Sequence, residues 1–139
     1  AVIPDLRVYV EVKHLDAAWD AALLAVMDAG PSPGRCSVHS FDHRLVARLK
    51  RKASGLSTGV LSSSYPVDPI GQVRQAGAGT LWQAWELIDR PLVEVCASEG
   101  VALIAWTVNM ESQAQSLISL GVSMLCGDWP HRLRQPRAG

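Results

Sequence analysis

The sequence predicts an α/β fold built on a parallel sheet with helical crossovers. Short segments rich in β-branched and aromatic residues alternate with longer segments whose hydrophobic residues recur at helical spacing. This alternation is typical of parallel sheets, because two parallel strands need a long connection between them. The 139 residues are 48% hydrophobic and 19% charged, a composition typical of one globular domain with a core.

The first predicted strand is VYVEV (8–12), and a helix follows at 15–30. Asp16 is suited to cap the start of this helix, and Gly30 is suited to end it. Four hydrophobic residues are predicted to share its buried face: Trp19, Leu23, Val26 and Met27.

A second predicted strand, RCSVHSF (35–41), leads into a helix over 41–53 that Asp42 is suited to cap. A third short strand is predicted at 57–63. Within the helix, Leu45, Val46 and Leu49 are predicted to be buried, and Arg48, Lys50 and Arg51 to face water.

In the second half of the chain, residues 64–89 show no clear secondary-structure pattern, whereas residues 90–128 do. Residues 64–89 hold Gly, Pro and aromatic residues in no clear period, so we expect mostly loop with some helical turns. The elements predicted after this loop are a helix at 90–100, a strand at 101–109, a helix at 110–121 and a strand at 122–128. The prediction is therefore five strands in all.

Charge and hydropathy exclude several classes of partner. Lys plus Arg and Asp plus Glu number 13 each, so no global field attracts nucleic acid or an acidic membrane surface. No hydrophobic run approaches the ~18 residues of a membrane span. We expect residues 1–130 to form the domain and residues 131–139 to form a short basic tail.

Cysteine usage and the first residues bear on the compartment. Cys36, Cys96 and Cys126 are odd in number and lie far apart, which argues against a disulfide framework or a zinc site. We expect reduced, buried thiols and a cytoplasmic location. The chain begins without an initiator Met or a signal peptide, so we expect a piece of a longer protein, with any signal peptide preceding these residues.

Two charged residues, Glu11 and Lys13, stand at the end of the first predicted strand. They share one face of it, because alternate residues of a strand point the same way. Parallel strands are usually continuously hydrophobic, so such charges are expected where the sheet opens to solvent, which is where sites form. A purely structural ion pair is the alternative reading of the same residues.

Four segments resemble, in order, the C-terminal part of the glycerophosphodiester phosphodiesterase family. They are YVEVK (9–13), HSFDHRLVARLK (39–50), VALIAWTVN (101–109) with Glu111 after it, and LGVSMLCGDWP (120–130). The family shows E-x-K, S-F-D and W-T-V-N motifs and a final G-V-D-x-[IL]-x-T-D-x-P, and its members are (β/α)8 barrels. The resemblance covers nearly the whole chain.

The chain also departs from the family pattern. Ser123 and Gly127 stand where the family usually has Asp and Thr, and His39 stands where it usually has a small residue. The family's N-terminal signatures, His-Arg-Gly, Glu-Asn-Thr, Glu-x-Asp and His-Asp, are missing. A complete barrel takes about 250 residues. We therefore expect a partial TIM barrel of about five strands, the fourth to the eighth, with exposed sheet edges.

The resemblance implies hydrolysis of small glycerophosphodiesters to an alcohol and glycerol 3-phosphate. The family uses one divalent cation, Mg²⁺ or Ca²⁺, and a pair of histidines as acid and base. That pair belongs to the missing strands, so the isolated chain is expected to be inactive. None of the four histidines of this chain inherits the role: His14, His39, His43 and His131. The oligomeric state is left open.

The resemblance also assigns roles to single residues. Glu11 matches the metal-ligand carboxylate, and Lys13 is expected to contact a phosphate oxygen. Trp106 is expected to line the pocket against the glycerol moiety, with a core aromatic as the alternative. Phe41 is expected at the barrel mouth, where it either packs or contacts the substrate. Asn109 is expected to cap the following helix.

Two other functions remain open. A degenerate, non-catalytic barrel fragment acting as a binding module is favoured by the departures at Ser123 and Gly127 and opposed by the intact Glu11 and Lys13. An unrelated phosphate-binding α/β domain would need a glycine-rich loop between a strand and a helix, and AGAGT (76–80) only weakly resembles one.

Overall fold

The computed structural model describes residues 6–30 and 32–133. Within these residues the chain forms six strands and five α-helices that alternate along the sequence. They fall into two compact units, one within residues 1–61 and 71–80 and the other within 62–70 and 81–139. The predicted α/β class is confirmed, and each unit is described by itself below.

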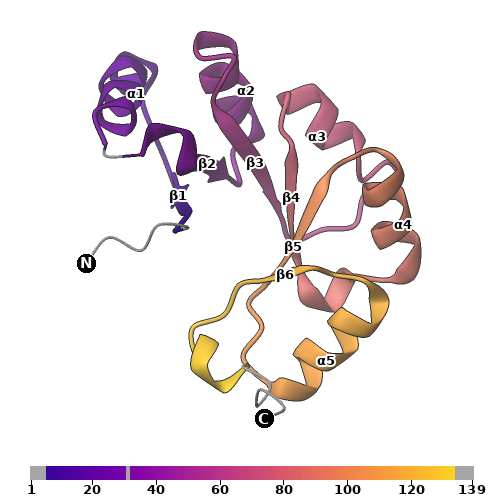
Figure 1. Ribbon diagram of the computed structural model, residues 1–139. Coiled ribbons are helices and arrows are strands. Elements are labelled where there is room, and N and C mark those ends of the chain that lie inside the picture. Colours follow the sequence, from indigo (N-terminus) through magenta and orange to yellow (C-terminus); the bar gives the residue numbers. More distant parts are fainter. Residues whose placement is uncertain (1–5, 31, 134–139) are drawn as a thin grey trace. The chain divides into compact units, whose positions relative to one another are not determined.

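The first unit is a run of parallel strands with helical crossovers (Figure 1). The strands lie in chain order, and Glu11 is registered opposite His39 on the neighbouring strand. On the part of the chain that the structure describes, β1 has a neighbour on one side only. The elements are β1 (Val8–Glu11), α1 (Asp20–Asp28), β2 (Cys36–Ser40), α2 (His43–Lys52), β3 (Ser57–Ser62) and α3 (Gly71–Ala76).

The core of this unit lies between β1, β2 and the two helices that follow them. Val12, Val38, Met27, Leu45 and Leu49 form one buried cluster. The predicted buried stripe of α2 is thereby confirmed, because Leu45, Val46 and Leu49 are all buried.

The predicted buried face of α1 is partly wrong. Trp19 and Val26 are 64% and 72% exposed, whereas Asp20 and Met27 are buried. Asp16 caps a 3₁₀ turn, Ala17–Trp19, by accepting a hydrogen bond from the Ala18 backbone N–H, and α1 begins after that turn. The helix is therefore turned relative to the prediction, so that its one buried carboxylate faces inward.

That carboxylate, Asp20, joins α1 to α2. It accepts two hydrogen bonds from Arg48, at 2.8 and 3.0 Å, and one from the Lys52 ammonium at 2.8 Å. Arg48 also donates to the Leu15 carbonyl at 2.9 Å. The prediction that Arg48 faces water is therefore wrong. The Arg48 hydrogen bonds hold the pKa of Asp20 below its ordinary value, against the opposing effect of burial.

The second unit continues the alternation. Its strands follow chain order, and β5 pairs in parallel with β6, with Ile104 opposite Met124. The elements are β4 (Thr80–Ala84), α4 (Arg90–Ser98), β5 (Ala102–Trp106), α5 (Glu111–Leu120) and β6 (Met124–Leu125).

The predicted count of five strands is wrong, because β4 lies in the stretch that was expected to be mostly loop. Leu81, Trp82 and Gln83 are buried there. The polar Gln83 interrupts the hydrophobic run that would have predicted a strand here. Its side-chain amide donates a hydrogen bond to the Ser64 carbonyl at 3.0 Å. A satisfied buried amide of this kind depends on a residue that is distant in sequence.

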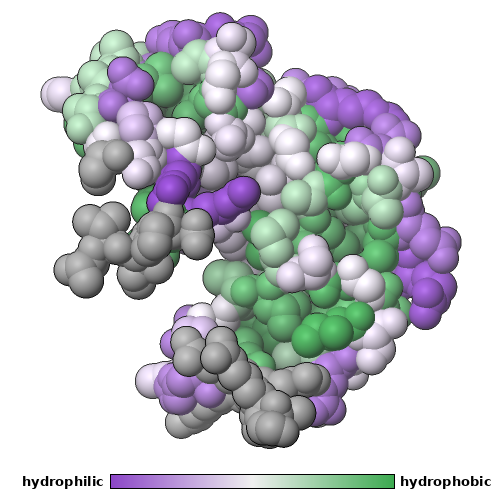
Figure 2. Space-filling model, in the orientation of Figure 1, coloured by the Kyte–Doolittle hydropathy of each residue, from purple (hydrophilic) through white to green (hydrophobic). Residues whose placement is uncertain are grey.

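The outward sides of α2 and α4 are hydrophilic (Figure 2). Arg51 on α2 and Arg90 and Glu94 on α4 are exposed there. Among the described residues, every helix is too short or too polar to cross a membrane.

The cysteine prediction is confirmed only in part. All three cysteines are free thiols, but Cys96 is buried, Cys36 is half-buried and Cys126 is exposed. Burial raises the pKa of the Cys96 thiol to about 11. The cytoplasmic location stays a prediction.

Candidate active site

Glu11 and Lys13 form an ion pair at the carboxyl end of β1. The Lys13 Nζ donates to Glu11 Oε1 at 2.5 Å and lies 5.9 Å from the centroid of the Phe41 ring. The Lys13 side chain is 76% exposed and that of Glu11 is 32% exposed. The structure thus brings together three of the four residues that the sequence predicted for the site.

The backbone of this strand end is fixed by the S-F-D turn after β2. The Ser40 hydroxyl donates to the Val12 carbonyl at 2.6 Å and accepts from the Asp42 backbone N–H at 3.0 Å. The Val12 N–H donates to the His39 carbonyl at 2.9 Å. Ser40 is fully buried, so it holds the E-x-K segment against the neighbouring strand.

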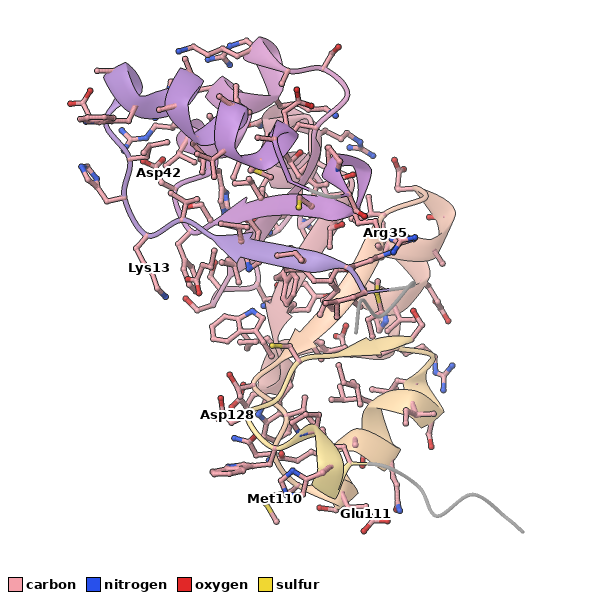
Figure 3. The ribbon with its side chains drawn as sticks, turned by 60° about the vertical axis from the view of Figure 1, so that its left-hand side comes forward. Lys13, Arg35, Asp42, Met110, Glu111 and Asp128 are labelled. Carbon is pink, nitrogen blue, oxygen red and sulfur yellow. The ribbon has the colours of Figure 1, made fainter. Side chains whose placement is uncertain are left out.

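Asp42 completes this turn as the cap of α2. Its carboxylate accepts from the Arg44 and Leu45 backbone N–H groups at 3.1 and 3.4 Å, which confirms the predicted N-cap. Hydrogen bonding from the Arg44 side chain lowers the pKa of Asp42. Figure 3 shows Asp42 and Lys13 at one end of these strands and Arg35 at the other.

His39 lies on the face of the sheet that carries Glu11. It is only 5% exposed, and its ring centroid lies 6.2 Å from that of Tyr9, with the two planes tilted by 60°. Burial lowers the pKa of His39; the Glu11 carboxylate opposes this shift and the Lys13 ammonium adds to it. The imidazole is therefore favoured in its neutral form.

Trp106, the fourth predicted residue, ends β5 in the second unit, where it is half-buried. Its peptide bond to Thr107 is cis. Its predicted contact with the glycerol moiety stays a prediction.

Asn109 does not cap the helix that follows it. Its side-chain amide donates to the Asp128 carboxylate and accepts from the Asp128 backbone N–H, both at 2.9 Å. Met110 occupies the N-cap position, and the Gln113 side chain accepts from its backbone N–H at 3.1 Å. Asn109 therefore joins the loops after β5 and β6, because a reciprocal pair to Asp128 satisfies both ends of its amide.

Gly127 is explained by a close approach of two backbones. A Cβ at this position would lie 2.0 Å from the Val108 carbonyl oxygen. The same loop is held by a hydrogen bond of 2.8 Å from the Val108 N–H to the Cys126 carbonyl. The threonine that the family usually carries here would not fit this backbone.

Gly127→Ala is expected to destabilise the protein by about 1–3 kcal/mol, because the added methyl group forces the two backbones apart. The measurement is urea-induced unfolding followed by circular dichroism. The control is Gly55→Ala, where a Cβ would meet nothing within 4 Å. That change is expected to stay within about 0.5 kcal/mol. Equal effects of the two substitutions would contradict the steric explanation.

A pocket of about 550 Å³ lies elsewhere in the first unit. Its walls come from the end of α1, the turn Pro33–Arg35 and the segment after α2, and include Leu24, Met27 and Lys52. None of the predicted site residues lines it. The Lys52 ammonium on this wall is already bound to Asp20, and Asp28 on the same wall carries a negative charge that would repel a phosphodiester. The described lining therefore does not favour a phosphodiester.

The donor chemistry allows a limited test of a metal site. Glu11 offers the hard carboxylate oxygen that Mg²⁺ and Ca²⁺ prefer. Within residues 6–30 and 32–133, no group of three or more His, Cys, Asp or Glu side chains is placed to hold a metal ion. Glu11 therefore fits as one ligand, and these residues do not form a metal centre by themselves.

Comparison with known proteins decides the family. The model of the glycerophosphoryl diester phosphodiesterase family matches residues 3–132, nearly the whole chain. The chain belongs to this family. The resemblance inferred from the four motifs is thereby confirmed.

Relatives of known sequence and structure agree with this assignment. A glycerophosphodiester phosphodiesterase of Caldanaerobacter subterraneus subsp. tengcongensis is 30% identical over 99 residues, which are 71% of this chain and 41% of that protein. A crystal structure described as a putative glycerophosphodiester phosphodiesterase from Galdieria sulphuraria is 18% identical, with a TM-score of 0.86 over 93% of this chain and 56% of that one.

A second similar structure carries a ligand. It is a phosphodiesterase of Oleispira antarctica in complex with the product sn-glycerol-3-phosphate, 20% identical, with a TM-score of 0.83 over 92% of this chain and 53% of that one. The two similar structures show that the fold is shared. The chain spans about half the length of these relatives. Its six strands do not fit the predicted numbering as the fourth to the eighth strand of a barrel, which allows only five.

Proposed function

We propose that this glycerophosphodiester phosphodiesterase family chain supplies part of a site that hydrolyses a small glycerophosphodiester to an alcohol and glycerol 3-phosphate. The observation that carries the proposal is the Glu11–Lys13 pair at the carboxyl end of β1, in a chain that matches the family over residues 3–132. The carboxyl ends of strands are where the sites of α/β folds form.

We assign Glu11 and Lys13 to the two charged partners in the reaction, the cation and the phosphate. Glu11 would contribute one ligand to a divalent cation, Mg²⁺ or Ca²⁺, and Lys13 would contact a phosphate oxygen as a point charge. When bound, the cation would offset the negative charge of the phosphodiester and of its transition state. The exposed Lys13 ammonium can leave Glu11 for the phosphate without disturbing a buried contact.

We assign the two aromatic residues to substrate contact. Phe41 lies beside the Lys13 ammonium, so it would border the phosphate on one side. Trp106 would pack against the glycerol moiety, as the resemblance implies. Neither residue carries charge in the reaction, so their expected contribution is to orient the substrate.

The proposal places the acid and base outside these residues. His43 Nε2 lies 2.8 Å from the Leu61 carbonyl, which indicates a structural role, and His14 is exposed beside Lys13. We therefore expect the 139-residue chain alone to release no glycerol 3-phosphate. Turnover by these residues alone would contradict this assignment.

The experiment that tests the proposed function uses the protein expressed from the whole reading frame. It is incubated with glycerophosphocholine or glycerophosphoethanolamine, and glycerol 3-phosphate is measured with and without a chelator. We expect product that disappears when the cation is removed. A protein that binds the diesters without hydrolysing them would be a binding module instead.

Lys13→Ala is expected to raise KM for a glycerophosphodiester by about tenfold or more, because a charge-assisted hydrogen bond contributes about 1.5–3 kcal/mol. Lys13→Arg should recover part of the loss. The matched control is Arg7→Ala, which removes an exposed cation before the start of the same strand. If Arg7→Ala raised KM as much as Lys13→Ala, the effect would be one of general charge and not of a phosphate contact.

A further inference from the structure

We propose that His39 is a positioning residue for Glu11: its buried imidazole holds the carboxylate in the direction needed to bind the cation. The inference rests on the proposed function, because it takes Glu11 to be a cation ligand. His39 stands where the family usually has a small residue, so this feature distinguishes the chain from the usual family pattern.

The strand register places the two side chains next to each other. Glu11 and His39 are direct partners in the parallel pairing of β1 with β2. The pairing continues past them, because the Val12 N–H donates to the His39 carbonyl at 2.9 Å. Paired residues of neighbouring strands point to the same face and have backbones about 4.8 Å apart. Glu11 and His39 therefore share one face as cross-strand neighbours.

The surroundings of the imidazole restrict its movement. His39 is 5% exposed, and the Tyr9 ring lies beside it, one step closer to the amino end on the face that carries Glu11. Glu11, by contrast, has a flexible side chain that is 32% exposed. A fixed ring beside a flexible carboxylate limits the rotamers that the carboxylate can adopt.

This support matters most when substrate is present. In the described structure Lys13 holds the Glu11 carboxylate at 2.5 Å. Once Lys13 turns to the phosphate, as proposed above, the carboxylate loses that contact. The direct partner of Glu11 on β2 is then the buried His39 ring. Replacing a residue that orients a metal ligand commonly weakens metal binding by about 10–100-fold.

The test measures cation affinity without any substrate. Mn²⁺ is titrated into the protein expressed from the whole reading frame, and its dissociation constant is determined by calorimetry. We expect His39→Ala to weaken Mn²⁺ binding by about tenfold. His39→Gln should retain most of the affinity, because its amide fills similar space. In a Glu11→Gln background, the further change His39→Ala should have no added effect.

His14→Ala is the control, because His14 is exposed and lies one residue from Lys13. Unfolding curves of each variant separate lost affinity from lost folding, and His39→Gln serves if His39→Ala does not fold. The proposal is overturned if His39→Ala leaves Mn²⁺ affinity unchanged, or weakens it equally with and without Glu11. If the wild-type protein bound Mn²⁺ through Glu11 but released no glycerol 3-phosphate, the proposed reaction would be overturned. The proposed role of His39 would still be decided by the Mn²⁺ affinities of the variants.

Discussion

Glu11→Gln in the protein expressed from the whole reading frame is expected to lower kcat/KM for a glycerophosphodiester by about 100-fold or more. The substitution keeps the size of the side chain but removes the charge that would hold the cation. Loss of a metal's charge stabilisation costs several kcal/mol in the transition state, and about 1.4 kcal/mol corresponds to tenfold in rate. The measurement is the initial rate of glycerol 3-phosphate release at saturating Mg²⁺ or Ca²⁺.

Glu94→Gln on the exposed side of α4 is the matched control, since it removes the same charge from a helix surface. Its kcat/KM should equal that of the wild-type protein. If Glu11→Gln retained full activity, the Glu11–Lys13 pair would be structural, and the family assignment would then describe the fold without locating the chemistry.

Asp20→Ala is expected to destabilise the protein by about 3–5 kcal/mol, which is the usual effect of breaking a buried ion pair from one side. Asp20 is fully buried and binds both Arg48 and Lys52, so its removal leaves two cations of α2 without their carboxylate. The measurement is urea-induced unfolding. Asp28→Ala, on the exposed end of the same helix, should change stability by less than about 0.5 kcal/mol.

The same carboxylate predicts a dependence of stability on pH. The pKa of Asp20 is lower in the folded protein than its ordinary value of 3.8. Its contribution is therefore fully present above that ordinary value and is lost as the pH falls through the lowered folded pKa. We expect the stability difference between wild type and Asp20→Asn to be constant near neutral pH and to shrink well below pH 3.8. A difference that stayed constant down to the acid limit would contradict this linkage.

Most elements of the fold could be predicted because their signals are local. The alternation of β-branched strands with helical periods located β1, β3 and β5, and a side-chain cap at Asp42 fixed the start of α2. Gly121 ends α5 with φ +105°, a conformation that favours glycine. The strand β4 was missed because its buried Gln83 depends on Ser64, which no periodicity reveals.

In the candidate site, too, some residues could be predicted from the sequence and others could be recognised only in the structure. Glu11 and Lys13 stand out because charges interrupt a hydrophobic strand at its end. Ser40 and Arg48 did not stand out, because each acts on a partner 28 residues away, Val12 and Asp20 respectively. His39 could be recognised only as a departure from a family pattern, and its place beside Glu11 required the strand register.

The most direct test of the central claim is a crystal structure of the protein with Mn²⁺ and glycerol 3-phosphate, in which anomalous scattering locates the metal. We predict Mn²⁺ bound to the Glu11 carboxylate and a phosphate oxygen bound to Lys13, with the ion pair between these two residues opened. Glycerol 3-phosphate bound away from the end of β1, with Glu11 still paired to Lys13, would contradict the claim.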